Sequence, residues 1–311
     1  MNGATAAPGL SFVIPVYDEE GNVGPLHAEL TRVAGALGRS YEIVFVNDGS
    51  RDATLARLER LRADDGHVRI VDLDGNFGEA AAVSAGFAHA RGEIIVTLDG
   101  DGQNDPADVP QLLARLGPDV DVVSGRRRAR KEAFLTRVLP SRLANGLIVL
   151  ATGVPVHDCG CGLKAYRREV VAGAQLPRGM NRFLPAILGV DPARVAEVRV
   201  GDRQRGSGRS HYGIGRTAVV LRDLLSLPLL TRRPLRGLVL GRPRTRIPAV
   251  AVPVTLVAIV AALGLPAGPV AMAGTVVVFA GAAAAAAAMI HNIRRVVQAR
   301  EQGVFRVRRV F

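Results

Sequence analysis

Short apolar runs alternate with longer stretches of mixed polarity along the first 125 residues. The runs have the length and β-branched content of strands buried in a parallel sheet, and the stretches between them have the length of helices. The predicted strands are Leu10–Val16, Tyr41–Asn47, Val68–Asp72 and Gly92–Leu98, and the predicted helices are Val23–Leu37, Asp52–Ala63 and Glu79–Ala90, with Asp52 or Ser50 as cap of the second helix. This alternation indicates a doubly wound α/β fold.

A second pattern lies near the other end of the sequence. Residues 247–292 contain no Asp, Glu, Lys or Arg, and a turn-forming Gly- and Pro-rich stretch interrupts them at Gly264–Pro269. Ile247–Leu265 and Val270–Ile290 each have about the ~20 residues that a membrane-spanning helix needs. Arginines flank both outer ends, so the positive-inside rule places both termini in the cytoplasm. The alternative is a buried helical hairpin of a soluble domain. Met1–Leu10 lacks the features of a signal peptide.

The charge of the chain is divided unevenly along its length. Residues 1–125 hold 20 acidic and 9 basic residues, whereas residues 126–311 hold 8 acidic and 31 basic residues, which together give the net charge of +12. The acidic half is therefore expected to bind a ligand that needs carboxylates, and the basic half to face phosphates or an anionic membrane. Trp is absent and aromatic residues make up 4% of the chain, which argues against binding of nucleic acid by base stacking.

The two cysteines, Cys159 and Cys161, are separated by one residue. A disulfide at this spacing is geometrically awkward, so we expect reduced, packed thiols and a cytosolic environment. The neighbouring His157 is a lone histidine, for which we expect a structural position.

Polar, carboxylate-rich loops follow each of the four predicted strands. They are Tyr17–Asn22, Asn47–Ser50, Asp74–Gly78 and Asp99–Gln103. Ligands of open α/β sheets bind outside the carboxyl ends of the strands, so the four loops predict one binding site at that edge.

The fourth loop has the chemistry of a metal site. Asp99 and Asp101 stand two residues apart beyond a strand end, and Gln103 offers a further oxygen. Such ligands suit Mg²⁺ or Mn²⁺ shared with a diphosphate. The sequence contains no GxxxxGK[ST] loop and no GxGxxG after the first strand, which excludes a P-loop NTPase and disfavours a dinucleotide fold.

Five segments together resemble the family 2 glycosyltransferases of the GT-A fold. The segments are VIPVYDEEGN (13–22), VNDGSRDAT (46–54), DGNFGEAAAVSAGF (74–87), LDGDGQNDP (98–106) and DCGCGLKAYRREVV (158–171). The chain looks most like the polyprenyl-phosphate glycosyltransferase branch, which includes dolichyl-phosphate mannose synthases and bacterial undecaprenyl-phosphate sugar transferases. The resemblance covers about residues 10–215, and the two apolar segments match the bacterial members.

The resemblance implies a role for several residues of the acidic half. Pro15, Tyr17 and Glu19 resemble the base and ribose pocket of the nucleotide sugar, and Asp48 resembles a nucleobase contact. Asp99 resembles the residue near the ribose and the metal. Asp101 resembles the direct metal ligand, and Gln103 the residue that assists it.

For the basic half, the resemblance implies contacts to phosphate. Arg126 or Arg127 is the candidate that follows a strand-like segment at Val120–Ser124, and Asp158 matches a carboxylate on the acceptor side. Arg203 begins a segment that resembles the R-x-x-G-x-S-K-Y loop, in which Gly208, Arg209 and Ser210 replace Ser, Lys and Tyr. Arg209 keeps the charge and adds bidentate geometry. Glu79 stands where relatives often carry Lys or Gln.

These features predict an inverting, metal-dependent transfer of a sugar from a nucleotide diphosphate, preferably UDP over GDP, to a polyprenyl phosphate such as undecaprenyl phosphate. Catalysis is expected to depend on Asp99, Asp101, Asp158, Arg126 and Arg203. The alternatives are an enzyme of the same fold with a glycan or diacylglycerol-type acceptor and, remotely, a basic membrane-anchored binding protein without enzymatic activity.

The expected organisation has four parts. Residues 1–215 form a GT-A domain, with the nucleotide part at about 10–125 and the acceptor part at about 126–215. Within the acceptor part, residues 126–150 are expected to form a basic amphipathic helix that lies on the membrane. A basic juxtamembrane segment with a second such helix follows at 216–246, then two transmembrane helices within 247–292 and a basic tail at 293–311. We expect a multi-pass protein of the cytoplasmic membrane that self-associates, with a tetramer as the form suggested by relatives, and that binds no nucleic acid.

Overall fold

A computed structural model of the chain describes residues 7–128, 146, 148–149, 153–177, 179–203, 239–240, 247–248, 287, 294 and 303–311. The described strands are β1 (Leu10–Val16), β2 (Tyr41–Asn47), β3 (Val68–Leu73), β4 (Ile94–Thr97), β5 (Val122–Arg127), β6 (Lys164–Arg167), β7 (Val195–Val200), β8 (Val239–Leu240), β9 (Ile247–Pro248) and β10 (Val307–Val310). The described α-helices are α1 (Val23–Leu37), α2 (Thr54–Asp64), α3 (Glu79–His89), α4 (Val109–Arg115), α6 (Arg168–Val171) and α7 (Leu184–Ile187), and short 3-10 turns lie at Pro106–Asp108, Asn181–Phe183 and Pro192–Arg194.

The first seven elements confirm the predicted alternation of strand and helix. β1, α1 and β2 have the predicted bounds, because each apolar run ends at a clear stop: α1, for example, ends at Gly38 in the left-handed conformation that glycine favours. α2 begins at Thr54, later than predicted, and the side chain of Asp52 accepts a hydrogen bond from the Thr54 amide at 2.9 Å. Ser50, the alternative cap, accepts from the amide of Asp18.

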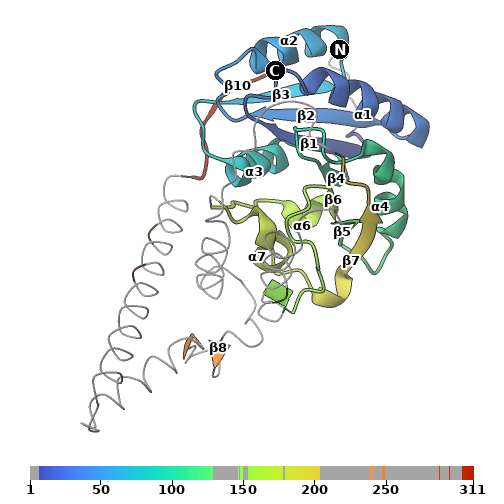
Figure 1. The fold of residues 1–311 in the computed structure, drawn as a ribbon, viewed down its shortest axis with the longest axis vertical. Helices are drawn as coiled ribbons and strands as arrows, with labels where there is room; N and C mark the ends of the chain where they lie inside the picture. Colours follow the sequence, from blue (N-terminus) through green and yellow to red (C-terminus); the bar gives the residue numbers. More distant parts are fainter. Residues whose placement is uncertain are drawn as a thin grey trace.

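Eight of the described strands form one sheet in the order β10-β3-β2-β1-β4-β6-β5-β7 (Figure 1). β1 is the central strand and pairs in parallel with β2 and β4, and β2 pairs in parallel with β3. The sheet is nevertheless mixed, because β6 enters between β4 and β5 and runs antiparallel to both. The purely alternating pattern of the first 125 residues does not reveal this strand, which comes from a later part of the chain.

Helices cover both faces of the sheet, and each face has its own apolar core. On one face α3 packs with the 153–190 segment, through residues such as Val83, Phe87 and Phe183. On the other face α1, α2 and α4 contribute Leu30, Leu58 and Leu112. Figure 1 shows α1 and α2 on the side of β1–β3 that lies opposite to α3. With both faces covered, the open parts of the sheet are its strand ends and edges.

Part of the predicted basic tail is a strand of the sheet. Val307–Val310 forms β10, which pairs antiparallel with β3 and completes the sheet at its edge. The V-R-R-V sequence does not look like a strand, because two of its four residues are arginines and give no apolar signal. Val307 nevertheless packs against the core on the α3 face.

The predicted membrane helices fall almost wholly outside the described residues, as does most of the predicted juxtamembrane segment. Among the described residues we find no helix with the length and hydropathy that a bilayer crossing requires. Ile247 and Pro248, predicted as the start of the first membrane helix, lie instead in β9, which pairs antiparallel with β8. Proline has no amide hydrogen to donate to a neighbouring strand, and it is therefore tolerated in a short edge strand such as β9.

A buried carboxylate stabilises the end of the sheet where β1 and β2 begin. Glu42 is buried and accepts hydrogen bonds from the Ser11 hydroxyl at 2.6 Å and from the Arg91 amide at 2.6 Å and Nε at 2.9 Å. Burial by itself raises the pKa of Glu42, but the hydrogen bonds from Ser11 and Arg91 and the charge of Arg91 outweigh it, so its pKa lies below the usual value.

Replacing Glu42 by glutamine is therefore expected to lower the free energy of unfolding by about 1.5–3 kcal/mol at neutral pH. Because the folded pKa is depressed, the contribution of Glu42 is complete above its unfolded pKa and is lost as the pH falls through its folded pKa. The wild type and the variant should thus converge in acid. Circular dichroism melts of the full chain between pH 7 and pH 3 measure this, with the exposed Glu93→Gln as a matched control. Equal melting temperatures at neutral pH would contradict it.

Candidate functional site

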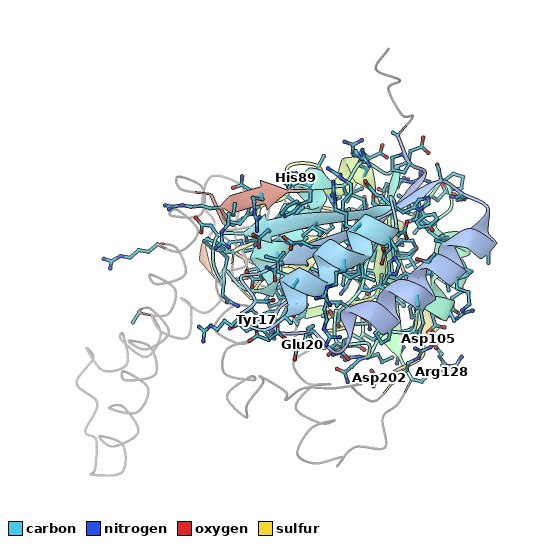
Figure 2. All side chains as sticks on the ribbon, turned by 90° about the horizontal axis from the view of Figure 1, so that it is seen from above. Tyr17, Glu20, His89, Asp105, Arg128 and Asp202 are labelled. Carbon is cyan, nitrogen blue, oxygen red and sulfur yellow. The ribbon has the colours of Figure 1, made fainter. Side chains whose placement is uncertain are left out.

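The four predicted loops meet at the carboxyl edge of the sheet. The first two loops are joined by the hydrogen bond from the Arg51 amide to Asp18 Oδ1 at 2.7 Å. The fourth loop lies against the end of β1, where a Cβ on Gly100 would stand 2.8 Å from the carbonyl oxygen of Pro15. Figure 2 shows side chains of this edge, among them Tyr17, Glu20 and Asp105, on the opposite side of the domain from His89. The convergence expected from the sequence is present.

The residues that follow β1 form the first wall of the site. Asp18 has a φ of +53°, an unusual conformation for a residue other than glycine, which its carboxylate and amide hydrogen bonds hold in place. The amide of Glu19 donates to Thr54 Oγ1 at 2.9 Å, and its carboxylate accepts from the side chain of Asn22. Tyr17 is half-buried beside them. Asp18 was not among the predicted site residues, although it orders the loop that carries Tyr17 and Glu19.

Asp48 joins the second loop to the third. It is 3% exposed, and its two carboxylate oxygens accept hydrogen bonds from the amides of Phe77 at 2.7 Å and Gly78 at 2.8 Å. The function visible in the structure is therefore to fix the loop that leads into α3. The nucleobase contact implied by the family resemblance stays a prediction.

Asp99 lies among charged side chains of both signs. Its pKa is raised to about 7, first by burial and then by the negative charges of Glu79 and Asp101, whereas the positive charges of Lys164 and Arg127 oppose the rise. Glu79, whose role the sequence left open, thus acts on the metal motif through its charge. The charges of Glu79 and Asp101 repel that of Asp99, and a bound cation would relieve this repulsion.

The loop of Asp99 and Asp101 is held in shape by its own hydrogen bonds. Asp101 is 7% exposed, and its Oδ1 accepts from the amide of Gln103 at 3.0 Å. The amide of Asp99 donates to Asn104 Oδ1 at 2.9 Å. A Cβ on Gly162 would stand 2.1 Å from Asp99 Oδ1, so only glycine allows the backbone of the 158–163 segment to pass this close to the carboxylate.

These donors fit a divalent cation that is shared with a ligand. Within the described ranges, no group of three or more His, Cys, Asp or Glu side chains is arranged to hold a metal ion. Asp99 and Asp101 supply carboxylate oxygens, and a hard cation held by one or two carboxylates completes its coordination with water and phosphate oxygens. Gln103, the predicted assistant, makes its observed contacts through its backbone.

Two of the predicted phosphate-binding arginines, Arg126 and Arg127, have different surroundings. Arg127 forms a bidentate pair with Asp158, with Nε–Oδ2 and Nη2–Oδ1 distances of 2.8 and 2.9 Å. Burial raises the pKa of Asp158, but the hydrogen bonds and charge of Arg127 outweigh it and hold that pKa below its usual value. Arg126, one residue earlier in β5, is exposed. The structure thus makes Arg126 the more accessible cation of the two.

Arg203 is engaged with carboxylates in the structure. Its guanidinium bonds to Glu29 at 2.7 Å and to Asp105 at 2.7 Å, and its amide donates to the carbonyl oxygen of Gln103 at 3.0 Å. These contacts hold the start of the predicted phosphate loop against the metal motif. Contact of Arg203 with phosphate stays a prediction, and Arg209 lies outside the described residues.

The sequence did not identify the buried Lys164 as a site residue. Its side chain is 5% exposed, and its Nζ donates to the carbonyl oxygens of Cys159 at 3.5 Å and of Cys161. The signal was available: Lys164 is one of two lysines in a chain whose other basic residues are all arginine. A buried ammonium group next to acidic side chains is a compact point charge, whereas an exposed guanidinium group is a planar set of hydrogen-bond donors.

The neighbouring cysteines and histidine agree with their predicted structural positions. Cys159 and Cys161 are buried free thiols, and burial raises the pKa of each to about 12. They are therefore packed, protonated thiols. His157 is exposed and its Nδ1 lies 2.7 Å from Glu197 Oε2.

Comparison with known sequences places the chain among glycosyltransferases. Residues 11–173 match the family model described as Glycosyl transferase family 2. A dodecaprenyl-phosphate galacturonate synthase of Rhizobium johnstonii is 42% identical over 227 residues, which cover 72% of this chain and 67% of the relative. An undecaprenyl-phosphate 4-deoxy-4-formamido-L-arabinose transferase of Shewanella sediminis is 38% identical over 230 residues, which cover 74% of this chain and 69% of the relative.

Two solved structures share the fold at low sequence identity. The glucosyl-3-phosphoglycerate synthase of Mycobacterium tuberculosis, solved with Mn²⁺, UDP-glucose and phosphoglyceric acid, has a TM-score of 0.57 and 22% identity, over 78% of this chain and 87% of that one. The mannosyl-3-phosphoglycerate synthase of Rubrobacter xylanophilus has a TM-score of 0.57 and 16% identity, over 78% and 85%. Together with the family match, these similarities confirm the predicted α/β fold class.

Proposed function

Because the chain belongs to glycosyl transferase family 2, we propose that it transfers a sugar, with inversion, from a nucleotide diphosphate to the phosphate of a polyprenyl phosphate. The observation that carries the proposal is the similarity to two relatives named for dodecaprenyl- and undecaprenyl-phosphate acceptors. Both similarities cover more than 70% of the chain and so reach beyond the 11–173 segment that defines the family.

The donor is proposed to bind at the carboxyl edge of the sheet. Pro15, Tyr17 and Glu19 would surround the base and ribose, with the second and third loops held together by Asp48. Asp101 and Asp99 would hold Mg²⁺ or Mn²⁺ with the diphosphate. When bound, the cation supplies positive charge that stabilises the departing nucleotide diphosphate. We favour UDP, and the presence of UDP-glucose and Mn²⁺ in a structure of the same fold supports this choice.

The charge of the acceptor phosphate explains why the reaction needs little help from a general base. The second pKa of a phosphate monoester is near ~6, so the acceptor is already an anionic nucleophile at neutral pH. Asp158 is a weak base, since Arg127 holds its pKa below the usual value. We therefore assign to Asp158 the positioning of Arg127, and to Arg126 and Arg209 the binding of the acceptor phosphate. Orienting two anionic groups in this way is a contribution that arginines can make.

A polyprenyl acceptor stays in the bilayer, so the predicted membrane helices within residues 247–292 would bring the catalytic domain to it. The arginines around them suit the cytoplasmic leaflet. We propose a cytoplasmic-membrane enzyme with its catalytic domain in the cytoplasm, and self-association of its copies.

The test uses the full chain in detergent or nanodiscs with undecaprenyl phosphate, Mn²⁺ and a panel of radiolabelled UDP- and GDP-sugars. We expect label in the organic phase with at least one donor, in a product that mild acid cleaves because the sugar is joined to phosphate. Parallel reactions with diacylglycerol or oligosaccharide acceptors are expected to stay unlabelled. Transfer to one of those acceptors alone would favour the alternative enzyme, and absence of transfer from every donor would refute the proposal.

A further inference from the structure

The 303–311 segment pairs with a strand that is far from it in the sequence. β10 pairs antiparallel with β3, and beyond it Phe311 exchanges two backbone hydrogen bonds with Ile70, at 2.9 and 3.3 Å. The ring of Phe311 lies 4.7 Å from the guanidinium of Arg309 and 5.9 Å from that of Arg62 in α2. The segment is thus fixed by main-chain pairing and by cation–π contacts.

Its arginines compensate a buried charge. Asp72 in β3 is completely buried, and its Oδ1 accepts a hydrogen bond from Asn47 Nδ2 at 2.8 Å. Its Oδ2 makes no hydrogen bond within the described part of the chain and lies 3.6 Å from Arg308 Nη1 and 3.6 Å from Arg309 Nη2. A buried carboxylate without a cation nearby is strongly unfavourable, so Asp72 depends on these two residues of the segment.

The partner of Asp72 leads directly into the donor site. Asn47 ends β2, and its side chain both donates to Asp72 and accepts from the amide of Ser50 at 3.3 Å. The next residue is Asp48, whose carboxylate holds the amides of Phe77 and Gly78. A change at Asp72 would therefore reach the second loop and, through it, the third.

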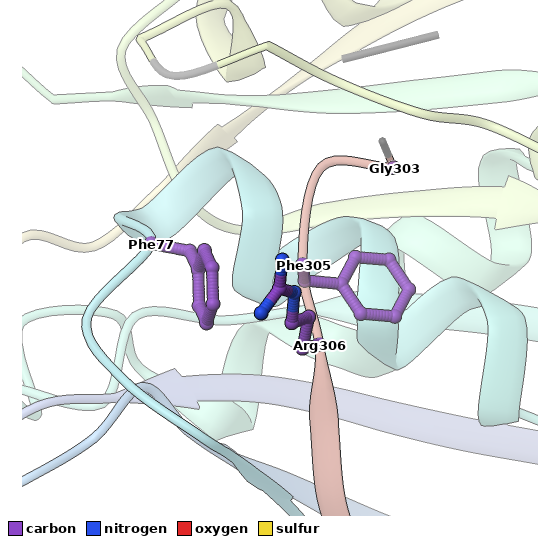
Figure 3. Close-up of a pocket in the computed structure, with 4 residues that line it drawn as sticks. All are labelled: Phe77, Gly303, Phe305 and Arg306. Atoms are coloured by element: carbon purple, nitrogen blue, oxygen red, sulfur yellow. The ribbon is translucent and has the colours of Figure 1, made fainter. Parts of the chain in front are cut away.

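The segment also binds the third loop directly, through hydrogen bonds to Asp74. The amide of Asp74 donates to the carbonyl oxygen of Arg306 at 3.0 Å, and Arg308 Nη2 donates to the carbonyl oxygen of Asp74 at 3.3 Å. Phe77, two residues before α3, lines a small pocket together with Phe305 and Arg306, and Figure 3 shows the side chain of Arg306 pointing toward Phe77. The segment thus reaches the second loop by a buried route through Asp72 and Asn47, and the third loop by a surface route through Asp74.

We propose that the 303–311 segment is a positioning element of the donor site, which orders the 47–50 and 74–78 loops by neutralising Asp72 and by holding Asp74. The inference rests on the proposed function in assigning these loops to the donor. It assigns to Arg308 and Arg309 an effect on donor binding, although neither belongs to the loops that form the site. The basic residues of the segment thereby serve the acidic half of the chain.

The test compares the full-length wild type with Arg308→Gln/Arg309→Gln, which keeps the strand but removes its charges. Hydrogen exchange followed by mass spectrometry is expected to show about 5- to 10-fold faster exchange in peptides that cover 46–52 and 74–79, and unchanged exchange in β4. The donor KM is expected to rise by about 5- to 10-fold, with kcat changed less than about twofold. This combination is expected when a variant loses binding energy that is the same in the ground state and in the transition state. Arg57→Gln/Arg60→Gln, two exposed arginines of α2, controls for the loss of two charges.

A third substitution separates positioning from general stability. Adding Asp72→Asn to the double variant removes the uncompensated charge but keeps the oxygen that accepts from Asn47, so loop protection and donor KM are expected to return towards wild type. Unchanged loop exchange in the double variant, or no recovery on adding Asp72→Asn, would overturn the inference. The exchange readout needs no ligand. A wild type that binds no nucleotide sugar would therefore refute the proposed function separately, while the exchange data still decide the inference.

Discussion

Replacing Asp101 by asparagine is expected to lower the rate of sugar transfer by about 10³-fold, at every concentration of Mg²⁺ or Mn²⁺. Asparagine keeps an oxygen that can accept from the amide of Gln103, so the turn at Asp101 should survive while the negative charge is lost. Asp101→Ala should lose both and be no more active. Initial rates across a titration of the cation, together with circular dichroism of each variant, measure the effect.

The comparison of the two Asp101 variants decides what the residue does. If Asp101→Asn transferred sugar at a near-normal rate while Asp101→Ala did not, the residue would matter for the turn and not for a cation. The metal assignment would then be wrong. Asp64→Asn is a useful control, because it removes the same charge from an exposed residue at the end of α2. We expect it to leave the rate within about twofold of the wild type, since surface substitutions of this kind have small effects.

Replacing Gly162 by alanine is expected to lower the rate by about 100-fold without unfolding the protein. The added Cβ would stand 2.1 to 2.4 Å from the carboxyl atoms of Asp99, and these are the nearest atoms that must move. The backbone of the fold can stay in place while the carboxylate shifts by about 1 Å, and a displacement of that size in an active site can cost about 10²-fold in rate. Steady-state rates with a thermal melt of the same sample measure both parts of this prediction.

Gly24→Ala provides the matched control for Gly162→Ala. Gly24 lies in α1, and a Cβ at this position would meet no atom of the described residues within 4 Å. We expect wild-type rates from it. If Gly162→Ala kept full activity, then Asp99 would not need its observed position. If it melted far below the wild type, the close approach would serve the fold and not the site.

Local patterns were sufficient for the first half of the fold. β1, β2 and α1 match their predicted bounds because each is a single buried or amphipathic segment whose neighbours are polar or glycine. β6 was missed for a physical reason: its four residues, KAYR, place a lysine and an arginine in a buried part of the sheet. Lys164 is tolerated there because carbonyl oxygens of the preceding loop bind its ammonium group. No local pattern contains that information.

The candidate site was predictable in its place but not in its internal contacts. The four acidic loops that follow four strands do meet at one edge of the sheet, as the sequence predicts. The sequence could not show that Arg127 pairs with Asp158, 31 residues away, or that Arg203 pairs with Glu29, 174 residues away. Such pairs depend on how distant segments are brought together. The division of charge between the halves was real, but arginines of the basic half are partly used inside the structure to balance the acidic half.

The late strand of the sheet also has a consequence for the synthesis of the protein. Arg308 and its partner Asp74 are 234 residues apart, so β3 leaves the ribosome long before β10 exists. At about 5–20 residues per second, that interval is roughly 10 to 50 s. During it β3 is an open edge strand, the kind of surface on which nascent chains aggregate. We expect the nascent domain to depend most on chaperones in that interval. The dependence should end when the 303–311 segment has been synthesised and pairs with β3.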